Sequence, residues 1–184
     1  MGVPSGYTSG QVVQAVPTGI NSALVLISST TISAAATTNV NDVFSATYDN
    51  YYIVFNGTAS TGVSAGTYFK LRVAGADAST NYTQQRVYSY STTVTAERDA
   101  GGTDEFLLFD SNATAKFGAD ITLLNPFNAA ATKFISFGLN DNNSIGIYNS
   151  FTTGANTNST SYTGFSLLSV GTISGVLKVY GLAN

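Results

Sequence analysis

Apolar and polar residues alternate along much of this chain. In residues 68–73 the apolar Phe69, Leu71 and Val73 are separated by more polar residues. Successive side chains of a strand point to opposite faces of a sheet, so this period of two predicts a strand with one buried face. Similar patterns predict further strands at 51–55, 85–90, 105–109, 120–124, 133–139, 144–148, 164–168 and 175–180.

Turn-forming residues separate the predicted strands. They occur at Asn56 and Gly57, at 74–77, at Gly101 and Gly102, at Asn125 and Pro126, and at 140–143. Strands that recur about every 8 to 12 residues between such turns are typical of all-β sandwiches and barrels. We therefore expect residues 21–184 to form one all-β domain, a jelly-roll-like antiparallel β-sandwich of about ten short strands. Residues 150–162, rich in Thr, Asn and Ser, predict a long loop.

The first 20 residues differ from the rest of the chain. Residues 1–10 hold three Gly, a Pro, two Ser and a Thr, and the next stretch alternates only weakly. This composition favours an extended N-terminal arm at 1–20 that docks on a neighbouring surface. The alternative is a plain disordered terminus. The candidate docking residues are Tyr7, Gln11, Val12, Val13 and Gln14.

Composition excludes several classes of function. The 184 residues contain no His and no Cys, which excludes Ser-His-Asp and Cys-His catalysis and the usual zinc, haem and iron–sulfur ligands. We expect no enzymatic activity and no cofactor. Seven basic residues against ten acidic ones give a net charge of −3, which disfavours nucleic acid as a partner. No apolar run approaches the roughly 20 residues of a membrane helix, so we expect no membrane insertion.

Carboxylates are the remaining candidates for chemistry. Glu97, Asp99, Asp104 and Glu105 flank the predicted turn at 101–102, and two carboxylates across a sugar site would suit a glycosidase. A solvated turn that carries charges is the favoured interpretation. Residues 140–143, with Asp49 and Asn50, offer oxygen ligands of the kind that calcium accepts, but such residues also form turns on their own. We therefore predict no metal site.

Tyrosine is the more informative resource. The chain has 11 Tyr, each of which combines apolar area with a polar tip, a combination common at surfaces that bind proteins or sugars. The alternative for most of them is ordinary strand packing. Our candidate partner or receptor surface comprises Tyr82, Tyr88, Tyr90, Asp104, Glu105, Tyr148 and Tyr162. Loops at 74–81, 97–105 and 150–162 are the segments where we expect recognition.

Three segments resemble a module of tailed-bacteriophage virion proteins, including those of cyanophages. They are residues 42–55 (DVFSATYDNYYIVF), 68–75 (YFKLRVAG) and 173–181 (ISGVLKVYG), and residues 10–15 are similar to the segment that leads into such modules in tail-fibre proteins. The resemblance implies an antiparallel β-sandwich, often trimeric, that serves as a tail fibre, another host-recognition part or a capsid decoration. It carries no active-site residues over to this chain.

Together these observations predict a non-enzymatic structural protein located in the virion. We expect a homo-oligomer, a trimer by the resemblance, whose partners are sister subunits, other virion proteins and a host surface glycan or receptor. Tail-fibre or host-attachment function is the leading hypothesis, and a capsid decoration protein on the head is the alternative. A carbohydrate-binding module or glycan-cleaving enzyme is the alternative from another class.

Overall fold

The computed structural model describes residues 23–59, 65–111, 116–142 and 146–183, and these form eleven β-strands and no helix. No helix in these ranges could therefore cross a membrane. The strands are β1 (Leu24–Val40), β2 (Asn50–Ala59), β3 (Ala65–Val73), β4 (Ala76–Asp77), β5 (Tyr82–Tyr90), β6 (Thr93–Thr103), β7 (Phe106–Ser111), β8 (Lys116–Leu124), β9 (Thr132–Asn142), β10 (Gly146–Asn156) and β11 (Gly164–Leu182). Every pairing is antiparallel, which confirms the predicted all-β, sandwich-like fold class.

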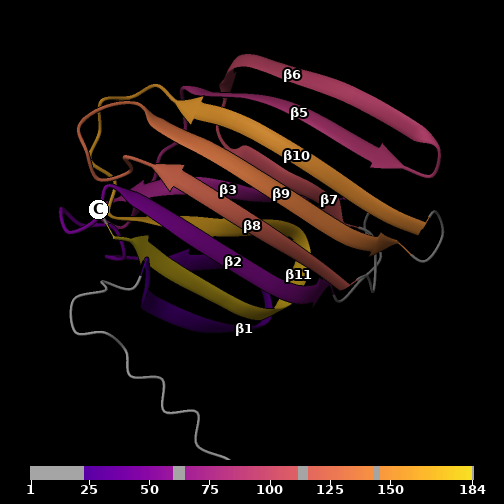
Figure 1. Cartoon of the computed structure of the whole chain (residues 1–184), viewed down its shortest axis with the longest axis horizontal. Coiled ribbons are helices and arrows are strands. Elements are labelled where there is room, and N and C mark those ends of the chain that lie inside the picture. Colours follow the sequence, from indigo (N-terminus) through magenta and orange to yellow (C-terminus); the bar gives the residue numbers. More distant parts are fainter. Residues whose placement is uncertain (1–22, 60–64, 112–115, 143–145, 184) are drawn as a thin grey trace, which may run out of the picture.

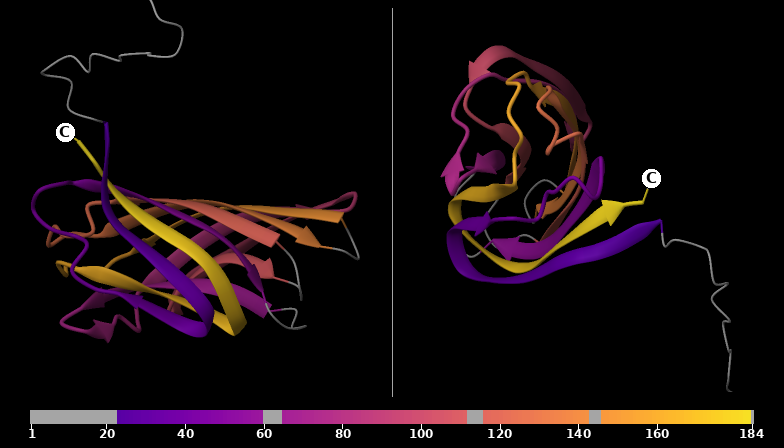
Figure 2. Two further views of the ribbon diagram at one scale, coloured as in Figure 1. Left: turned by 90° about the horizontal axis from the view of Figure 1, so that it is seen from below. Right: turned by 90° about the vertical axis from the view of Figure 1, so that its left-hand side faces the viewer.

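All the strands belong to one curled sheet. Its order is β4-β3-β11-β2-β8-β9-β10-β5-β6, with β1 also paired to β11 and β7 to β3. The strand β11 pairs with β3 over 164–169 and with β2 over 173–182, so it runs through the bend that joins the two parts of the sheet. Figure 2 shows the sheet curling round until β7 faces β9 and β10 across the core. Strands that pass from one layer to the other commonly make such corners.

Two glycines permit the close approach of β2 and β11 near this bend. Gly57 and Gly175 lie directly opposite each other in the pairing. A Cβ atom on Gly57 would lie 2.3 Å from the carbonyl oxygen of Ser174, and one on Gly175 would lie 2.2 Å from that of Asn56. The turn predicted at Asn56 and Gly57 is therefore wrong, because this glycine serves backbone approach inside a strand.

Other predicted boundaries also need correction. The strands expected at 164–168 and 175–180 are one strand of 19 residues, and β1, with 17 residues, was not predicted. The chain turns at Asp104 and Glu105 rather than at Gly101 and Gly102, which lie in β6. The loop expected at 150–162 is wrong over its first half, where β10 continues to Asn156. The recognition loops expected at 74–81 and 97–105 likewise include β4 and most of β6.

Aromatic rings from both parts of the sheet fill the core. Phe134 of β9 stacks on Phe106 with ring centroids 4.3 Å apart, and its centroid lies 5.8 Å from that of Phe69. Phe69 in turn stacks on Phe165 of β11 at 4.7 Å. Phe134 therefore joins the layer of β8 to β10 to the layer of β3, β7 and β11.

A buried arginine joins several segments near the beginning of β11. Arg72 of β3 forms an ion pair with Asp77 and donates hydrogen bonds to Asn41 Oδ1 at 3.1 Å, Asn39 Oδ1 at 3.2 Å and Ser166 Oγ at 2.8 Å. It also donates to the carbonyl oxygen of Gly75. The guanidinium thereby ties the end of β1 and the segment after it to β3, β4 and β11.

The predicted N-terminal arm, residues 1–20, lies outside the described residues. Its candidate docking residues, Tyr7 and 11–14, therefore stay predictions.

Candidate functional site

Three tyrosines gather where β5 ends and β10 begins. Tyr88 and Tyr90 occupy alternate positions of β5, and Tyr148 of β10 lies beside them because Ser150 pairs with Tyr88 and Asn149 with Ser89. The ring centroids of Tyr88 and Tyr148 are 5.6 Å apart, those of Tyr88 and Tyr90 6.2 Å, and those of Tyr90 and Tyr148 6.5 Å. The three rings are nearly parallel, at interplanar angles of 13° to 24°. We call these three residues the tyrosine cluster.

An ion pair borders the tyrosine cluster. Arg86 Nη2 lies 2.5 Å from Glu97 Oε2, Arg86 Nη1 donates to the Tyr148 hydroxyl at 3.3 Å, and the Tyr88 hydroxyl donates to Glu97 Oε1 at 2.9 Å. The Arg86 guanidinium also lies over the Tyr88 ring, 4.4 Å from its centroid, which is cation–π geometry. Arg86 itself is buried, whereas Glu97 is half exposed. The pair therefore orients Tyr88 while leaving an acceptor carboxylate at the surface.

A small cavity continues from this ion pair. Its volume is about 260 Å³, and its lining comprises Gln84, Arg86, Glu97, Arg98, Asp99 and Leu107. Gln84 Nε2 donates to Asp99 Oδ2 at 2.9 Å, so the amide and carboxylate are held in place. The tyrosine rings and these planar polar groups together offer stacking surfaces beside hydrogen-bonding groups. Binding sites for small polar molecules typically combine the two.

The contacts set the protonation states at the site. The hydrogen bond from Arg86 is the main reason why the pKa of Glu97 lies below its usual value. The hydrogen bond from Tyr88 to Glu97 stabilises the neutral phenol and raises the pKa of Tyr88. At neutral pH, Glu97 is therefore a carboxylate acceptor and Tyr88 a neutral donor.

This arrangement predicts a pH-dependent contribution of Glu97 to stability. A carboxyl whose pKa falls on folding stabilises the fold above its unfolded pKa, near 4.5, and loses that contribution as the pH falls through its folded-state value. We expect the stability difference between wild type and Glu97→Gln to be largest near neutral pH and to shrink below pH 4.5. Urea unfolding of both proteins across this pH range measures it, and a difference independent of pH would contradict the assignment.

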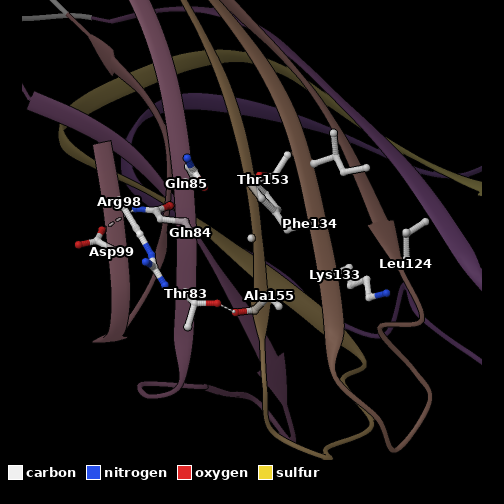
Figure 3. A pocket seen from close by; sticks show the side chains of 12 residues that line it. Thr83, Gln84, Gln85, Arg98, Asp99, Leu124, Lys133, Phe134, Thr153 and Ala155 are labelled. Carbon is white, nitrogen blue, oxygen red and sulfur yellow. Dashed lines mark hydrogen bonds between the residues drawn. The ribbon is translucent and has the colours of Figure 1, made fainter. Parts of the chain in front are cut away.

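A second hollow lies on the outer face of the sheet, across β8, β9, β10, β5 and β6. It encloses about 570 Å³, and its lining includes Thr83, Gln85, Arg98, Lys133 and Thr153. Figure 3 shows Arg98 and Lys133 on opposite sides of the groove with Thr83 and Ala155 between them. Two cationic side chains beside hydroxyl and amide groups suit a polar or acidic ligand.

Asp104 and Glu105 are both bound to one lysine. Lys70 Nζ lies 3.0 Å from Asp104 Oδ2 and 3.4 Å from Glu105 Oε2. The hydrogen bond from Lys70 lowers the pKa of Asp104, whereas burial raises the pKa of Glu105 despite the nearby ammonium. Glu97 and Asp99 have other partners, Arg86 and Gln84. Within the described ranges, no three acidic residues come together as a metal site.

Two predicted surface residues lie in the core instead. Tyr82 and Tyr162 are buried, and burial raises the pKa of Tyr82. The Tyr82 hydroxyl accepts from the Leu71 amide at 2.9 Å and donates to the Ala78 carbonyl at 3.2 Å. The Tyr162 hydroxyl donates to Asn156 Oδ1 at 2.9 Å. Both tyrosines hold strands and connections together and are unavailable to a partner. Tyr148 is also largely buried, so Tyr88 and Tyr90 are the two accessible rings of the tyrosine cluster.

Arg86 was missing from the predicted surface. It has the same strand parity as Tyr88 and Tyr90, so alternation alone places it on their face of the sheet. Its partner Glu97 had been considered only as one of four carboxylates. Lys133 and Arg98 of the outer groove were not among the predicted site residues, because nothing in the sequence shows that β9 and β6 bring them to one groove.

No protein-family model, curated protein or solved structure matches this chain.

Proposed function

We propose that this chain is a non-enzymatic structural protein of a tailed-phage virion, a homo-oligomeric tail-fibre or host-attachment component. One observation carries the proposal beyond the resemblance of separate segments. The segments 42–55, 68–75 and 173–181 include parts of β2, β3 and β11, and β11 pairs directly with both β2 and β3. The similar segments therefore lie on three neighbouring strands of one sheet, with part of 42–55 paired to part of 173–181 and 68–72 paired to residues 164–168 of β11 (Figure 1).

The tyrosine cluster supplies the attachment surface in this proposal, and the receptor is a host surface glycan. Sugars bind through stacking of their apolar faces on aromatic rings and through hydrogen bonds from planar polar groups. Tyr88 and Tyr90 offer rings, while the Glu97 carboxylate offers an acceptor at the adjoining cavity. Asp104 and Glu105, which belong to the predicted receptor surface, both form ion pairs with Lys70. We assign them no catalytic role.

The location is tested by electron microscopy of intact particles from the source lysate, labelled with gold-tagged antibody against this chain. Gold on the tail is the expected result. Gold spread over the head would instead make the chain a capsid decoration protein. Unlabelled particles would overturn the virion proposal.

The attachment surface is tested by Tyr90→Ala. Loss of an accessible ring at the centre of a binding site should lower the affinity of the purified chain for the host glycan by at least roughly tenfold. Adsorption of particles that carry the variant should fall in parallel. The matched control is Phe137→Ala, which removes an exposed ring from the opposite face of the sheet. Equal binding by wild type and Tyr90→Ala would contradict the assignment.

A further inference from the structure

The strand β1 lies at an edge of the sheet and has one neighbour. All 17 residues of Leu24–Val40 run beside β11, and no other strand among the described ranges pairs with β1 (Figure 1). Alternate residues of an edge strand direct backbone N–H and C=O groups away from the sheet. This edge can therefore accept another strand.

The other edge strands are protected against pairing with a strand of another molecule, whereas β1 is not. The long edge strand β6 carries Glu97, Arg98 and Asp99 in succession, and charges of this kind oppose pairing between sheets. The strands β4 and β7 are short, with two and six residues. In contrast, β1 contains no charged residue and no proline, and residues 1–41 as a whole contain no Asp, Glu, Lys or Arg. Two copies that meet along β1 would therefore bring no like charges together.

The start of β1 also exposes apolar side chains on both faces. Leu24, Val25, Leu26 and Ile27 are 44%, 37%, 53% and 36% exposed. Because successive residues of a strand alternate in direction, neither face of this segment is covered. A partner strand that brings its own apolar neighbours would cover both. An uncharged apolar edge is complementary to a second copy of itself, as a two-fold contact requires.

We propose that two copies of this chain pair β1 to β1, antiparallel across a two-fold axis, within 24–32. The register of β1 against β11 shifts between Leu26 and Ser28 and again after Ile32, so 28–32 is the longest regular stretch near the apolar end. The pairing would join two curled sheets into one continuous sheet. It follows from the fold and does not depend on the proposed function. A trimer would need a different contact, because a two-fold axis relates only two copies.

Light scattering of the full chain during size-exclusion chromatography tests the contact. The expected mass is twice the 19.1 kDa of one chain. The double variant Leu24→Lys/Leu26→Lys should be a monomer with an unchanged circular dichroism spectrum, because both side chains are exposed. The control, Val94→Lys, places one lysine on β6 at a residue that is 72% exposed and should remain a dimer. A monomeric or trimeric wild type, or a dimeric double variant, would overturn the proposal.

Cysteine scanning locates the axis independently, since the chain has no native cysteine. Single cysteines are introduced in turn at positions 24–31 and oxidised. A disulfide needs Cα atoms about 4.4 to 6.8 Å apart, so only positions beside the axis should yield a cross-linked dimer. Val94→Cys on β6 should yield none. A dimer that cross-links at no position of 24–31 would place the contact elsewhere and overturn the proposal. Failure of the proposed β1 contact would leave the virion proposal untouched, because the gold labelling decides that proposal separately.

Discussion

Replacing Phe134 by alanine is expected to lower the free energy of unfolding by about 4 kcal/mol, within the range observed for buried Phe→Ala substitutions. Phe134 is 1% exposed and contacts the rings of Phe106 and Phe69, which belong to the opposite part of the sheet. Its removal leaves a cavity where the two layers meet. For a chain of this length the melting temperature should fall by roughly 8 to 16 °C, measurable by thermal unfolding.

The matched control is Phe137→Ala on the same strand. Phe137 has the opposite parity in β9 and is 49% exposed. Its truncation removes the same atoms without opening an internal cavity and should cost less than about 1 kcal/mol. Equal losses for the two variants would contradict the assignment of Phe134 as the residue that joins the layers.

The contrast between β9 and β1 explains what the sequence could predict about the fold. From Thr132 to Asn140 the residues of β9 alternate strictly between buried and exposed, and its apolar residues occupy both sets. The strand was found because its pattern of residue types is typical of a sheet. Most of β1 is exposed on both faces, so burial imposes no alternation on it. Its structure comes from pairing with β11, about 140 residues away, and no local pattern reports such a partner.

Glycines had an ambiguous meaning for the same reason. A glycine after asparagine is a strong turn signal when only neighbours in sequence are considered. Gly57, however, lies opposite Gly175, where the backbones of β2 and β11 leave no room for a side chain. The continuous strand β11 was likewise predicted as two strands that leave out 169–174, a stretch that contains Gly171. Whether a glycine makes a turn or a close approach depends on a distant strand.

For the tyrosines of β5, the sequence indicates the face of the strand on which each one lies but not how exposed each one is. Tyr82, Tyr88 and Tyr90 share one parity of β5, so alternation places them on one face of this strand. Their exposure differs because Phe106, the first residue of β7, packs edge-on against Tyr82 with ring centroids 4.8 Å apart. The position of β7 follows from its pairing with β3, which the residues of β5 do not encode. Alternation along β5 therefore gives the face on which a residue lies but does not determine which end of that face is covered.

Replacing Arg72 by alanine is the second substitution with a large expected effect, a loss of about 3 kcal/mol in the free energy of unfolding. The side chain is buried, and its removal leaves Asp77, Asn39 and Ser166 without their shared donor. Among these acceptors Ser166 is buried, and it loses a charged donor that water does not readily replace, so the loss exceeds that of a surface ion pair. Urea unfolding measures it.

Two comparisons distinguish the loss of the Arg72 hydrogen-bond network from the general effect of removing a positive charge on stability. Arg98→Ala removes an exposed arginine from β6 and should change stability by less than about 0.5 kcal/mol. In a double-mutant cycle, Asp77→Ala should cost less when Arg72 is already alanine, because the carboxylate then has no guanidinium to stabilise it. Additive effects of Arg72→Ala and Asp77→Ala would show that the two side chains act independently. Asn39 near the end of β1 also accepts a hydrogen bond from Arg72, so the same buried cation helps to hold the edge strand on the sheet.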